Sequence, residues 1–127
     1  MSIKVKTNPK ILIAEDELVL QLMLNQMLLK MGFSDIVAVS KGSEVIDACD
    51  KTYFDLILMD IILMDEIDGI EAYGIIRRDK EIPVIYITGN TDQRNRERAE
   101  KLGFIDYLAK PVTYYQLSNA IMSVFKK

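Results

Sequence analysis

Residues 55–60 read DLILMD, a short apolar run that ends in an acid, and this stretch decides how the rest of the chain is interpreted. An apolar run without strict alternation predicts a strand that is buried on both faces. Two further runs have the same form, KILIAED at residues 10–16 and PVIYIT at residues 83–88. Strands of this kind need helices on both sides of their sheet, so the pattern predicts a parallel sheet in an α/β fold.

Segments of helical periodicity alternate with the apolar runs, and turn residues mark most of the changes. The predicted strands are residues 10–14, 35–39, 55–59, 83–88 and 106–109. The predicted helices run from an N-cap at Asp16 to Met31, over 40–49, over 69–78, from an N-cap at Thr91 or Asp92 to Leu102, and over 113–125. This alternation predicts a doubly wound sheet of five parallel strands with five helices.

The composition limits the classes of protein that the chain can represent. With 127 residues, 50% hydrophobic and 28% charged, it suits one globular domain over residues 1–127, without a linker or a second domain that could carry an output. The chain has no histidine, which excludes Ser/His/Asp catalysis and imidazole metal ligands. Its single cysteine, Cys49, excludes an internal disulfide and suits a small buried apolar side chain.

The charge and the N-terminal sequence bear on partners and location. The chain has 16 basic and 19 acidic residues, a formal net charge of −3, and its basic residues are scattered apart from Arg94, Arg96 and Arg98. This distribution offers no footprint for direct binding to nucleic acid or to an anionic membrane. The first apolar run is too short for a signal peptide or a membrane span, so we expect a cytoplasmic protein.

Polar side chains follow the predicted strands where each one ends. Glu15 and Asp16 follow the first strand, and Asp60 follows the third. Thr88 ends the fourth strand, and Lys110 follows the fifth. Sites in open parallel sheets form outside the carboxyl ends of the strands, so these residues are expected to share one rim. Carboxylates about 5 Å apart repel by roughly 3 kcal/mol at an effective dielectric constant of about 20, and an all-oxygen cluster favours a hard cation such as Mg²⁺.

This set of groups suits phosphoryl transfer. A carboxylate can act as the nucleophile and become an aspartyl phosphate. A lysine and a threonine hydroxyl beside a metal-bound carboxylate can donate to phosphoryl oxygens. Catalysis of phosphoryl transfer consists mostly of positioning and such electrostatic stabilisation.

Four motifs stand at successive strand ends: ILIAEDE at residues 11–17, LILMDIILMDEIDG at 56–69, PVIYITG at 83–89 and YLAKP at 107–111. In this order they resemble the receiver domain of two-component response regulators, and the resemblance covers essentially the whole chain. It implies a CheY-like, flavodoxin-like fold with strand order 2-1-3-4-5. It also implies a signalling phosphoacceptor that catalyses only its own phosphorylation and dephosphorylation and is otherwise not an enzyme.

The resemblance assigns the groups that bind metal and phosphate. Asp60 corresponds to the phosphoacceptor, which takes the phosphoryl group from a partner phosphohistidine. Glu15, Asp16 and Asp60 correspond to Mg²⁺ ligands, together with the backbone carbonyl of Ile62. Because the chain has no histidine, the donor cannot lie in this chain, and the resemblance implies a sensor histidine kinase or a histidine phosphotransfer protein as the partner.

The resemblance also implies a switch. Thr88 and Lys110 correspond to the pair that senses the phosphate, and Tyr107 corresponds to the aromatic switch residue. The bond between Lys110 and Pro111 is cis in the family. Phosphorylation there reshapes the face of the fourth helix, fifth strand and fifth helix, which can bind a downstream protein or a second copy. The predicted fourth helix has few apolar residues, and low local stability suits an element that moves.

The loop after Asp60 departs from the family's usual pattern. Met64 stands where most receivers carry a proline, and the loop is one residue longer, as in a subset of receivers. The acidic residues Asp65, Glu66 and Asp68 are expected to form a solvated loop, with modulation of metal affinity or repulsion of wrong partners as the alternatives. Ile62 and Asn90 stand where the family tunes dephosphorylation, and an apolar Ile62 predicts a fairly long-lived phosphoryl group.

The first helix carries two apolar stripes at about 100° per residue. The wider stripe is expected to face the sheet and contains Leu20, Met23, Leu24, Met27, Leu28 and Met31. A second stripe of Leu18, Leu22 and Leu29 lies away from its centre. In the family this helix meets the bundle that presents the phosphohistidine, so Leu18 and Leu22 are candidate docking residues, with simple extension of the core as the alternative.

Three other interpretations use some of the same features. The chain can be a receiver taken from a hybrid kinase or a phosphorelay, which passes its phosphoryl group onward. A metal-dependent phosphatase of α/β fold would use the same carboxylates to turn over phosphoesters. TGNTD at residues 88–92 resembles the phosphate loop of flavodoxins, but that loop follows the first strand, where this chain has two acids.

Overall fold

The computed structural model of the protein describes residues 8–89 and 92–125. Five parallel strands form one sheet, as the sequence pattern predicts, and their order β2-β1-β3-β4-β5 is the one that the resemblance implies. The strands are β1 (Lys10–Ala14), β2 (Asp35–Val39), β3 (Leu56–Met59), β4 (Val84–Thr88) and β5 (Asp106–Ala109). The helices are α1 (Leu18–Lys30), α2 (Gly42–Lys51), α3 (Gly69–Ile76), α4 (Gln93–Leu102) and α5 (Tyr114–Phe125).

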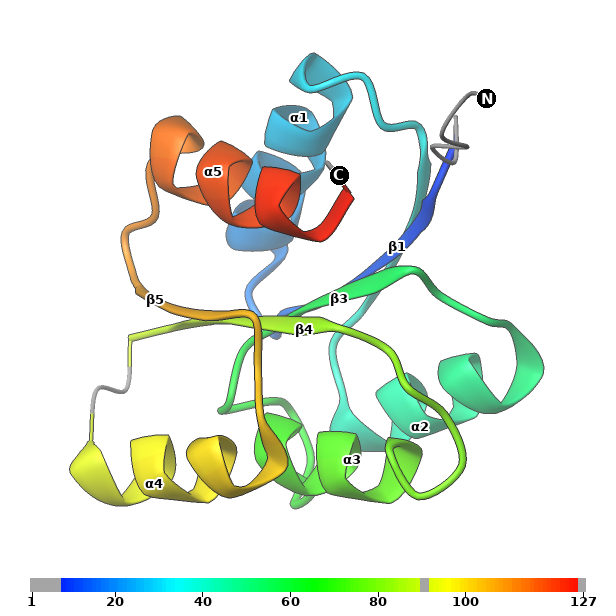
Figure 1. Cartoon of the computed structure of the whole chain (residues 1–127), viewed down its shortest axis with the longest axis vertical. Helices are drawn as coiled ribbons and strands as arrows, with labels where there is room; N and C mark the ends of the chain where they lie inside the picture. Colours follow the sequence, from blue (N-terminus) through cyan, green and yellow to red (C-terminus); the bar gives the residue numbers. More distant parts are fainter. Residues whose placement is uncertain (1–7, 90–91, 126–127) are drawn as a thin grey trace, which may run out of the picture.

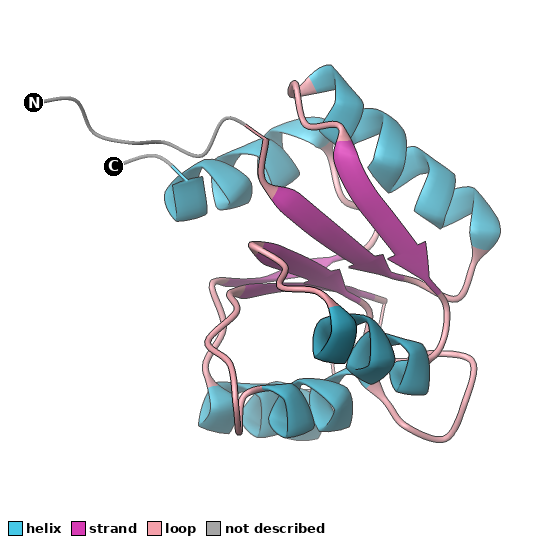
Figure 2. Cartoon of the chain, turned by 90° about the vertical axis from the view of Figure 1, so that its right-hand side faces the viewer, coloured by secondary structure: helices cyan, strands magenta, loops and turns pink. Residues whose placement is uncertain are grey.

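The sheet separates two layers of helices. Helices α1 and α5 cover one face, and α2, α3 and α4 cover the other (Figure 1). The side view in Figure 2 shows the strands between these layers. None of the helices in the described ranges is long and apolar enough to cross a membrane.

The central strands supply buried residues to both layers, which explains their unbroken apolar sequence. Alternate residues of β1, β3 and β4 join the core under α1 and α5, namely Ile11, Ile13, Leu56, Leu58, Ile85 and Ile87. The intervening residues join the core under α2, α3 and α4, namely Leu12, Ala14, Ile57, Met59, Val84 and Tyr86. Cys49 lies in this second core, and burial raises the pKa of its thiol to about 11. It is therefore a packed apolar side chain, as predicted.

The predicted start of the first helix is wrong. Asp16 is not its N-cap: α1 begins at Leu18 after Glu17, whose side chain makes no capping hydrogen bond. The N–H of Glu17 instead donates to the Glu15 carboxylate over 3.1 Å. Asp16 is drawn into the acidic rim at the end of β1 and does not cap the helix. The helix ends at Lys30, one residue before the predicted Met31, which is its C-cap. Gly32 follows with a φ of 101°, which favours glycine.

The buried stripe of α1 is narrower than predicted. Leu24 and Leu28 are buried, whereas Met23 is 45% exposed. Leu18 and Leu22 are 68% and 55% exposed, so they lie on a separate outer stripe and do not extend the core. The helix therefore presents apolar side chains to solvent close to its N-terminus.

The predicted caps of the fourth helix are Thr91 and Asp92, of which Thr91 lies outside the described residues. Asp92 is the N-cap, and its carboxylate accepts a hydrogen bond from the N–H of Arg94 over 2.8 Å. The segment that resembles a flavodoxin phosphate loop follows β4, and it does not follow β1, where the flavodoxin loop would lie.

Candidate functional site

The carboxyl ends of four strands bring the predicted site residues to one rim. Glu15 and Asp16 follow β1, Asp60 follows β3, Thr88 ends β4 and Lys110 follows β5. Parallel pairing aligns these ends, since Ala14 is the register partner of Met59 and Thr88 is the partner of Ala109. The rim is thus a direct result of the topology.

Three acids meet on this rim. One carboxylate oxygen from each of Glu15, Asp16 and Asp60 lies within 4.8 Å of the other two. Glu15 is 1% exposed and Asp60 is 5% exposed, so water screens their charges weakly. Hard oxygen ligands at this spacing fit Mg²⁺, which combines a few carboxylates with retained waters.

Lys110 bridges two of the acids. Its Nζ lies 2.8 Å from Oε1 of Glu15 and 2.7 Å from Oδ2 of Asp60. Burial raises the pKa of Glu15 to about 7, although the hydrogen bond from Lys110 opposes this rise. Burial lowers the pKa of Lys110, but its hydrogen bonds to Asp60 and Glu15 outweigh burial and raise that pKa above its usual value. The ammonium group therefore stays charged between the two carboxyl groups.

The backbone fixes Asp60 in place. Its N–H donates to the carbonyl of Ala14 over 2.9 Å, and its Oδ1 accepts from the N–H of Ile61 over 2.7 Å. The start of α3 packs against it, because an added Cβ at Gly69 would lie 2.1 Å from the Asp60 carbonyl oxygen. With Oδ2 held by Lys110, both carboxylate oxygens have defined positions.

An open hollow of about 630 Å³ lies over these groups. Its lining includes Asp16, Asp60, Thr88 and Lys110, together with Ile62, which is 53% exposed. Two of the predicted acids, Asp16 and Asp60, thus open with Thr88 and Lys110 onto one space that a small charged group can enter, whereas Glu15 is not part of its lining. Glu17, Gly89 and Asp92 complete the lining.

The predicted switch residue lies on β5, the strand that precedes Lys110. Tyr107 is half-buried on β5, with its ring 5.8 Å from that of Tyr86 and 5.6 Å from that of Phe104. The guanidinium of Arg96 lies 5.1 Å from the Tyr107 ring. The peptide bond between Lys110 and Pro111 is cis, as the resemblance implies. Asn90, the other position expected to tune dephosphorylation, lies outside the described residues.

The acidic residues of the loop after Asp60 are not simply solvated, which corrects the sequence-based expectation. Asp65 caps α2, where it accepts from the N–H groups of Gly42 and Ser43 over 2.9 and 3.1 Å. The Ser43 hydroxyl also donates to it over 2.7 Å and lowers its pKa below the ordinary value. Asp68 caps α3 and accepts from the N–H of Glu71 over 2.8 Å. The longer loop is therefore tied to the starts of two helices.

Sequence reasoning missed Gln21, which ties α1 to the rim. Its side-chain amide donates to the carbonyls of Glu15 and Val39 over 2.7 and 3.1 Å. These carbonyls lie at the ends of β1 and β2, so the amide holds the acidic turn against both strands. A half-buried polar residue one turn into an apolar helix is the signal that could have revealed it.

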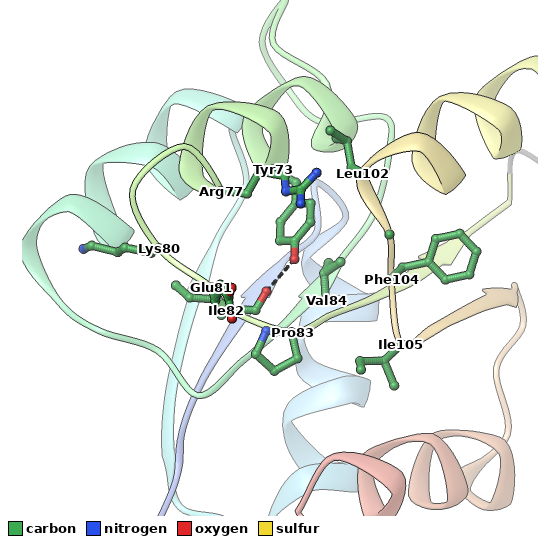
Figure 3. A pocket seen from close by; sticks show the side chains of 11 residues that line it. Tyr73, Arg77, Lys80, Glu81, Ile82, Pro83, Val84, Leu102, Phe104 and Ile105 are labelled. Atoms are coloured by element: carbon green, nitrogen blue, oxygen red, sulfur yellow. Dashed lines mark hydrogen bonds between the residues drawn. The ribbon is translucent and has the colours of Figure 1, made fainter.

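A second hollow, of about 430 Å³, lies at the amino ends of β4 and β5, at the opposite end of these strands from the rim (Figure 3). Arg77, Lys80 and Glu81 line it, with apolar residues around them. The Tyr73 hydroxyl donates to the Ile82 carbonyl over 2.6 Å, and Lys80 Nζ donates to the Cys49 carbonyl. Tyr73 and Lys80 thus have structural partners, and in the described ranges no cluster of three acids like that of the rim lies there.

A family model described as the response regulator receiver domain matches residues 11–122, which include every residue of the rim. The chain belongs to the response regulator receiver domain family. Receiver domains of two-component signalling are phosphorylated on an aspartate and have an acidic site that binds Mg²⁺. They are signalling phosphoacceptors and are generally not enzymes.

Known relatives carry the same domain in different contexts. The receiver domain is 29% identical over 127 residues to a probable transcriptional regulator of Guillardia theta, and it covers 49% of that protein's length. It is 37% identical over 109 residues, 84% of this chain, to the transcription factor SKN7 of Candida albicans, of which it covers 19%. The chain thus spans half or less of the length of these curated relatives.

A solved structure has the same fold and carries a metal. The receiver domain of a sensor histidine kinase from Pseudomonas aeruginosa PAO1 is 30% identical, with a TM-score of 0.84. The alignment covers 94% of this chain and 99% of that one. In that structure a magnesium ion is coordinated in the active-site cleft.

Proposed function

We propose that this receiver domain accepts a phosphoryl group on Asp60 from the phosphohistidine of a partner protein. The observation that carries the proposal is the bridge of Lys110 between Glu15 and Asp60, within a cluster of three acids on an open rim. A carboxylate oxygen of Asp60 forms a bond to phosphorus while the bond between phosphorus and the partner's imidazole nitrogen breaks. The chain has no histidine, so the donor lies outside these 127 residues.

Its own residues have distinct roles in this transfer. The carboxylates of Glu15, Asp16 and Asp60, with the Ile62 carbonyl, would hold Mg²⁺, which supplies positive charge next to the phosphoryl group. The Lys110 ammonium and the Thr88 hydroxyl donate to phosphoryl oxygens once the phosphoryl group is in place. Thr88 is buried at the end of β4, so this contact links the phosphate to the interior of the domain.

The test is the intact mass of the protein after incubation with a small acyl phosphate and Mg²⁺. Wild type should gain the mass of one phosphoryl group, and Asp60→Asn should gain none, because an amide is a poor nucleophile. Asp47→Asn is the matched control, since Asp47 is exposed on α2 away from the rim and this variant should label like wild type. Equal labelling of Asp60→Asn, or an unlabelled wild type that is folded by circular dichroism, would refute the assignment.

The partner's bundle docks on α1 in this proposal. Leu18 and Leu22 are exposed close to the acidic turn. Beside them an apolar hollow of about 300 Å³, lined by residues such as Met23, Met27 and Val112, reaches Glu15 and Lys110. Apolar side chains seated here would place the donor histidine next to Asp60.

Leu22→Asp should slow transfer from a phosphorylated histidine phosphotransfer protein about tenfold or more, because it places a charge in an apolar contact. Labelling by the small acyl phosphate should be unchanged, since that reagent needs no docking. Leu29→Asp is the matched control, because Leu29 is also exposed on α1 but two turns further from the rim. Normal transfer to a folded Leu22→Asp variant would exclude this docking surface.

A second function follows from the similarity to the receiver domain of a sensor histidine kinase. A receiver of a hybrid kinase or a phosphorelay passes its phosphoryl group onward to another histidine. The two functions differ in the fate of the label. Loss of label from Asp60 to an added phosphotransfer protein supports the relay, and label that leaves only as inorganic phosphate supports an end-point receiver.

A further inference from the structure

Helix α4 is attached to the domain by few apolar contacts. Among its residues only Ala99 is buried, and Leu102 is half-buried. The other helix of similar length on this face, α2, buries Val45 and Cys49. Little apolar burial implies a low free energy for local opening, so polar contacts carry much of the attachment of α4.

One ion pair ties α4 to the loop that begins at Asp60. Arg98 Nη2 lies 2.9 Å from Oδ2 of Asp68, and both side chains are only partly exposed. Asp68 is the N-cap of α3, next to Gly69, which packs against the Asp60 backbone. The pair thus connects α4 to the segment that contacts the candidate phosphorylation site. Helices α3 and α4 lie on the same side of the sheet (Figure 1).

A buried hydroxyl lies in the core that α4 helps to cover, which also contains Ala99 of this helix. Tyr86 is fully buried on β4, and its hydroxyl has no hydrogen-bond partner among the described residues. Its ring packs edge-on against Phe104 at 6.1 Å and lies 5.8 Å from Tyr107. Burial raises the pKa of Tyr86 strongly, and the charges of Asp68 and Arg98 act on it as well. A buried hydroxyl without a partner destabilises the conformation that holds it.

We propose that the Arg98–Asp68 ion pair is a latch that holds α4 in place over an unsatisfied Tyr86 hydroxyl, so that α4 is poised to open. The two groups act in opposite directions on one equilibrium. The ion pair stabilises the closed position of α4, and the hydroxyl destabilises it, because opening gives the hydroxyl access to water or to a new partner. The position of α4 therefore depends on two opposing contributions, and an equilibrium of this kind is the physical basis for coupling Asp60 to this face.

Hydrogen exchange of α4 amides in the unphosphorylated full chain measures this equilibrium directly. Tyr86→Phe should slow exchange in α4 about fivefold or more, because it removes the unsatisfied hydroxyl and keeps the ring. Arg98→Gln should accelerate it by about the same factor. The double variant should return towards wild type, since the two changes oppose each other.

Matched controls separate the latch from general effects. Arg94→Gln removes an exposed arginine of the same helix, and Tyr115→Phe removes a hydroxyl from a side chain that is 79% exposed. Both should leave α4 exchange unchanged. Exchange in β1 should change far less than in α4, because β1 opens only with the whole domain. Either of two results would overturn the proposal. The first is α4 exchange that is unchanged or faster in Tyr86→Phe, and the second is α4 exchange in Arg98→Gln that is no faster than in Arg94→Gln.

The coupling to Asp60 rests on the proposed function, whereas the latch does not. In a second set of measurements, the wild type labelled by acyl phosphate should exchange faster in α4 than the unlabelled protein. Arg98→Gln should show a much smaller increase, because its latch is already absent. Labelled wild type without faster α4 exchange would disprove the coupling but leave phosphorylation intact, and the mass measurement reports a failure of phosphorylation separately.

Discussion

At the scale of single residues, the rim depends on one close backbone approach. Gly69 leaves room for the Asp60 carbonyl, and its N–H donates to the Ile61 carbonyl over 2.8 Å. The sequence shows this glycine only as part of a turn. Gly69 is important at the site because the longer loop returns to the end of β3 and brings this residue against Asp60. No local sequence pattern encodes that return.

Gly69→Ala should destabilise the domain by about 1–3 kcal/mol, because the new methyl group would overlap backbone that cannot move aside cheaply. It should also slow labelling by the acyl phosphate, since relief of the overlap displaces Asp60. Thermal or urea unfolding and the mass measurement check both effects.

Gly74→Ala is the matched control for this change. Gly74 lies in the same helix, and a Cβ there would meet only the Leu102 side chain, at 3.5 Å. That variant should gain about 0.5–1 kcal/mol from helix propensity and label normally. If Gly69→Ala behaves like Gly74→Ala, the close approach has no part in shaping the site.

At the scale of elements, the loop between β3 and α3 connects the start of α2 to the start of α3. Its Met64 N–H donates to the Ser40 carbonyl over 2.9 Å, and Asp65 caps α2. Because the loop is acidic, the sequence suggested that it is solvated. The capping by Asp65 was missed because the N–H groups that it accepts from belong to a helix more than 20 residues earlier in the chain. Capping within one segment can be read from sequence, as for Asp92, but capping across segments depends on the fold.

Asp65→Asn should lower the stability of the domain at neutral pH, because the carboxylate accepts three hydrogen bonds at the start of α2. The pKa of Asp65 is lowered in the folded state, so its contribution is fully present above the ordinary carboxyl pKa. That contribution is lost as the pH falls through the lowered folded value. The difference between wild type and variant should therefore be constant near pH 7 and shrink in acid.

Glu66→Gln is the control for this titration, since it removes the same charge from the neighbouring, exposed position. Its stability should follow wild type across the whole pH range. Denaturant unfolding at several pH values makes the comparison. A gap between wild type and Asp65→Asn that widens in acid would contradict the capping role.

At the scale of the whole molecule, the fold was predictable and the fine geometry was not. Apolar runs fixed the central strands, and the bounds of β1, β2 and β5 are those predicted. The rim was predictable because parallel topology alone brings Asp16, Asp60 and Lys110 together. Three details were not predictable: the start of α1, the hydrogen bonds of Gln21 to the ends of β1 and β2, and the Arg98–Asp68 ion pair. Each depends on contacts between segments that sequence periodicity does not encode.

The two helical layers have a consequence for how the domain can be used. The proposed donor surface lies on α1, on one side of the sheet, and the latch on α4 lies on the other. A protein seated on each side would not compete for the same contacts, so the donor could still be bound when the receiving partner arrives. The two surfaces also pack on different cores, α1 on one and α4 on the other. Mutations on one side can therefore change the binding of one partner without changing the binding of the other.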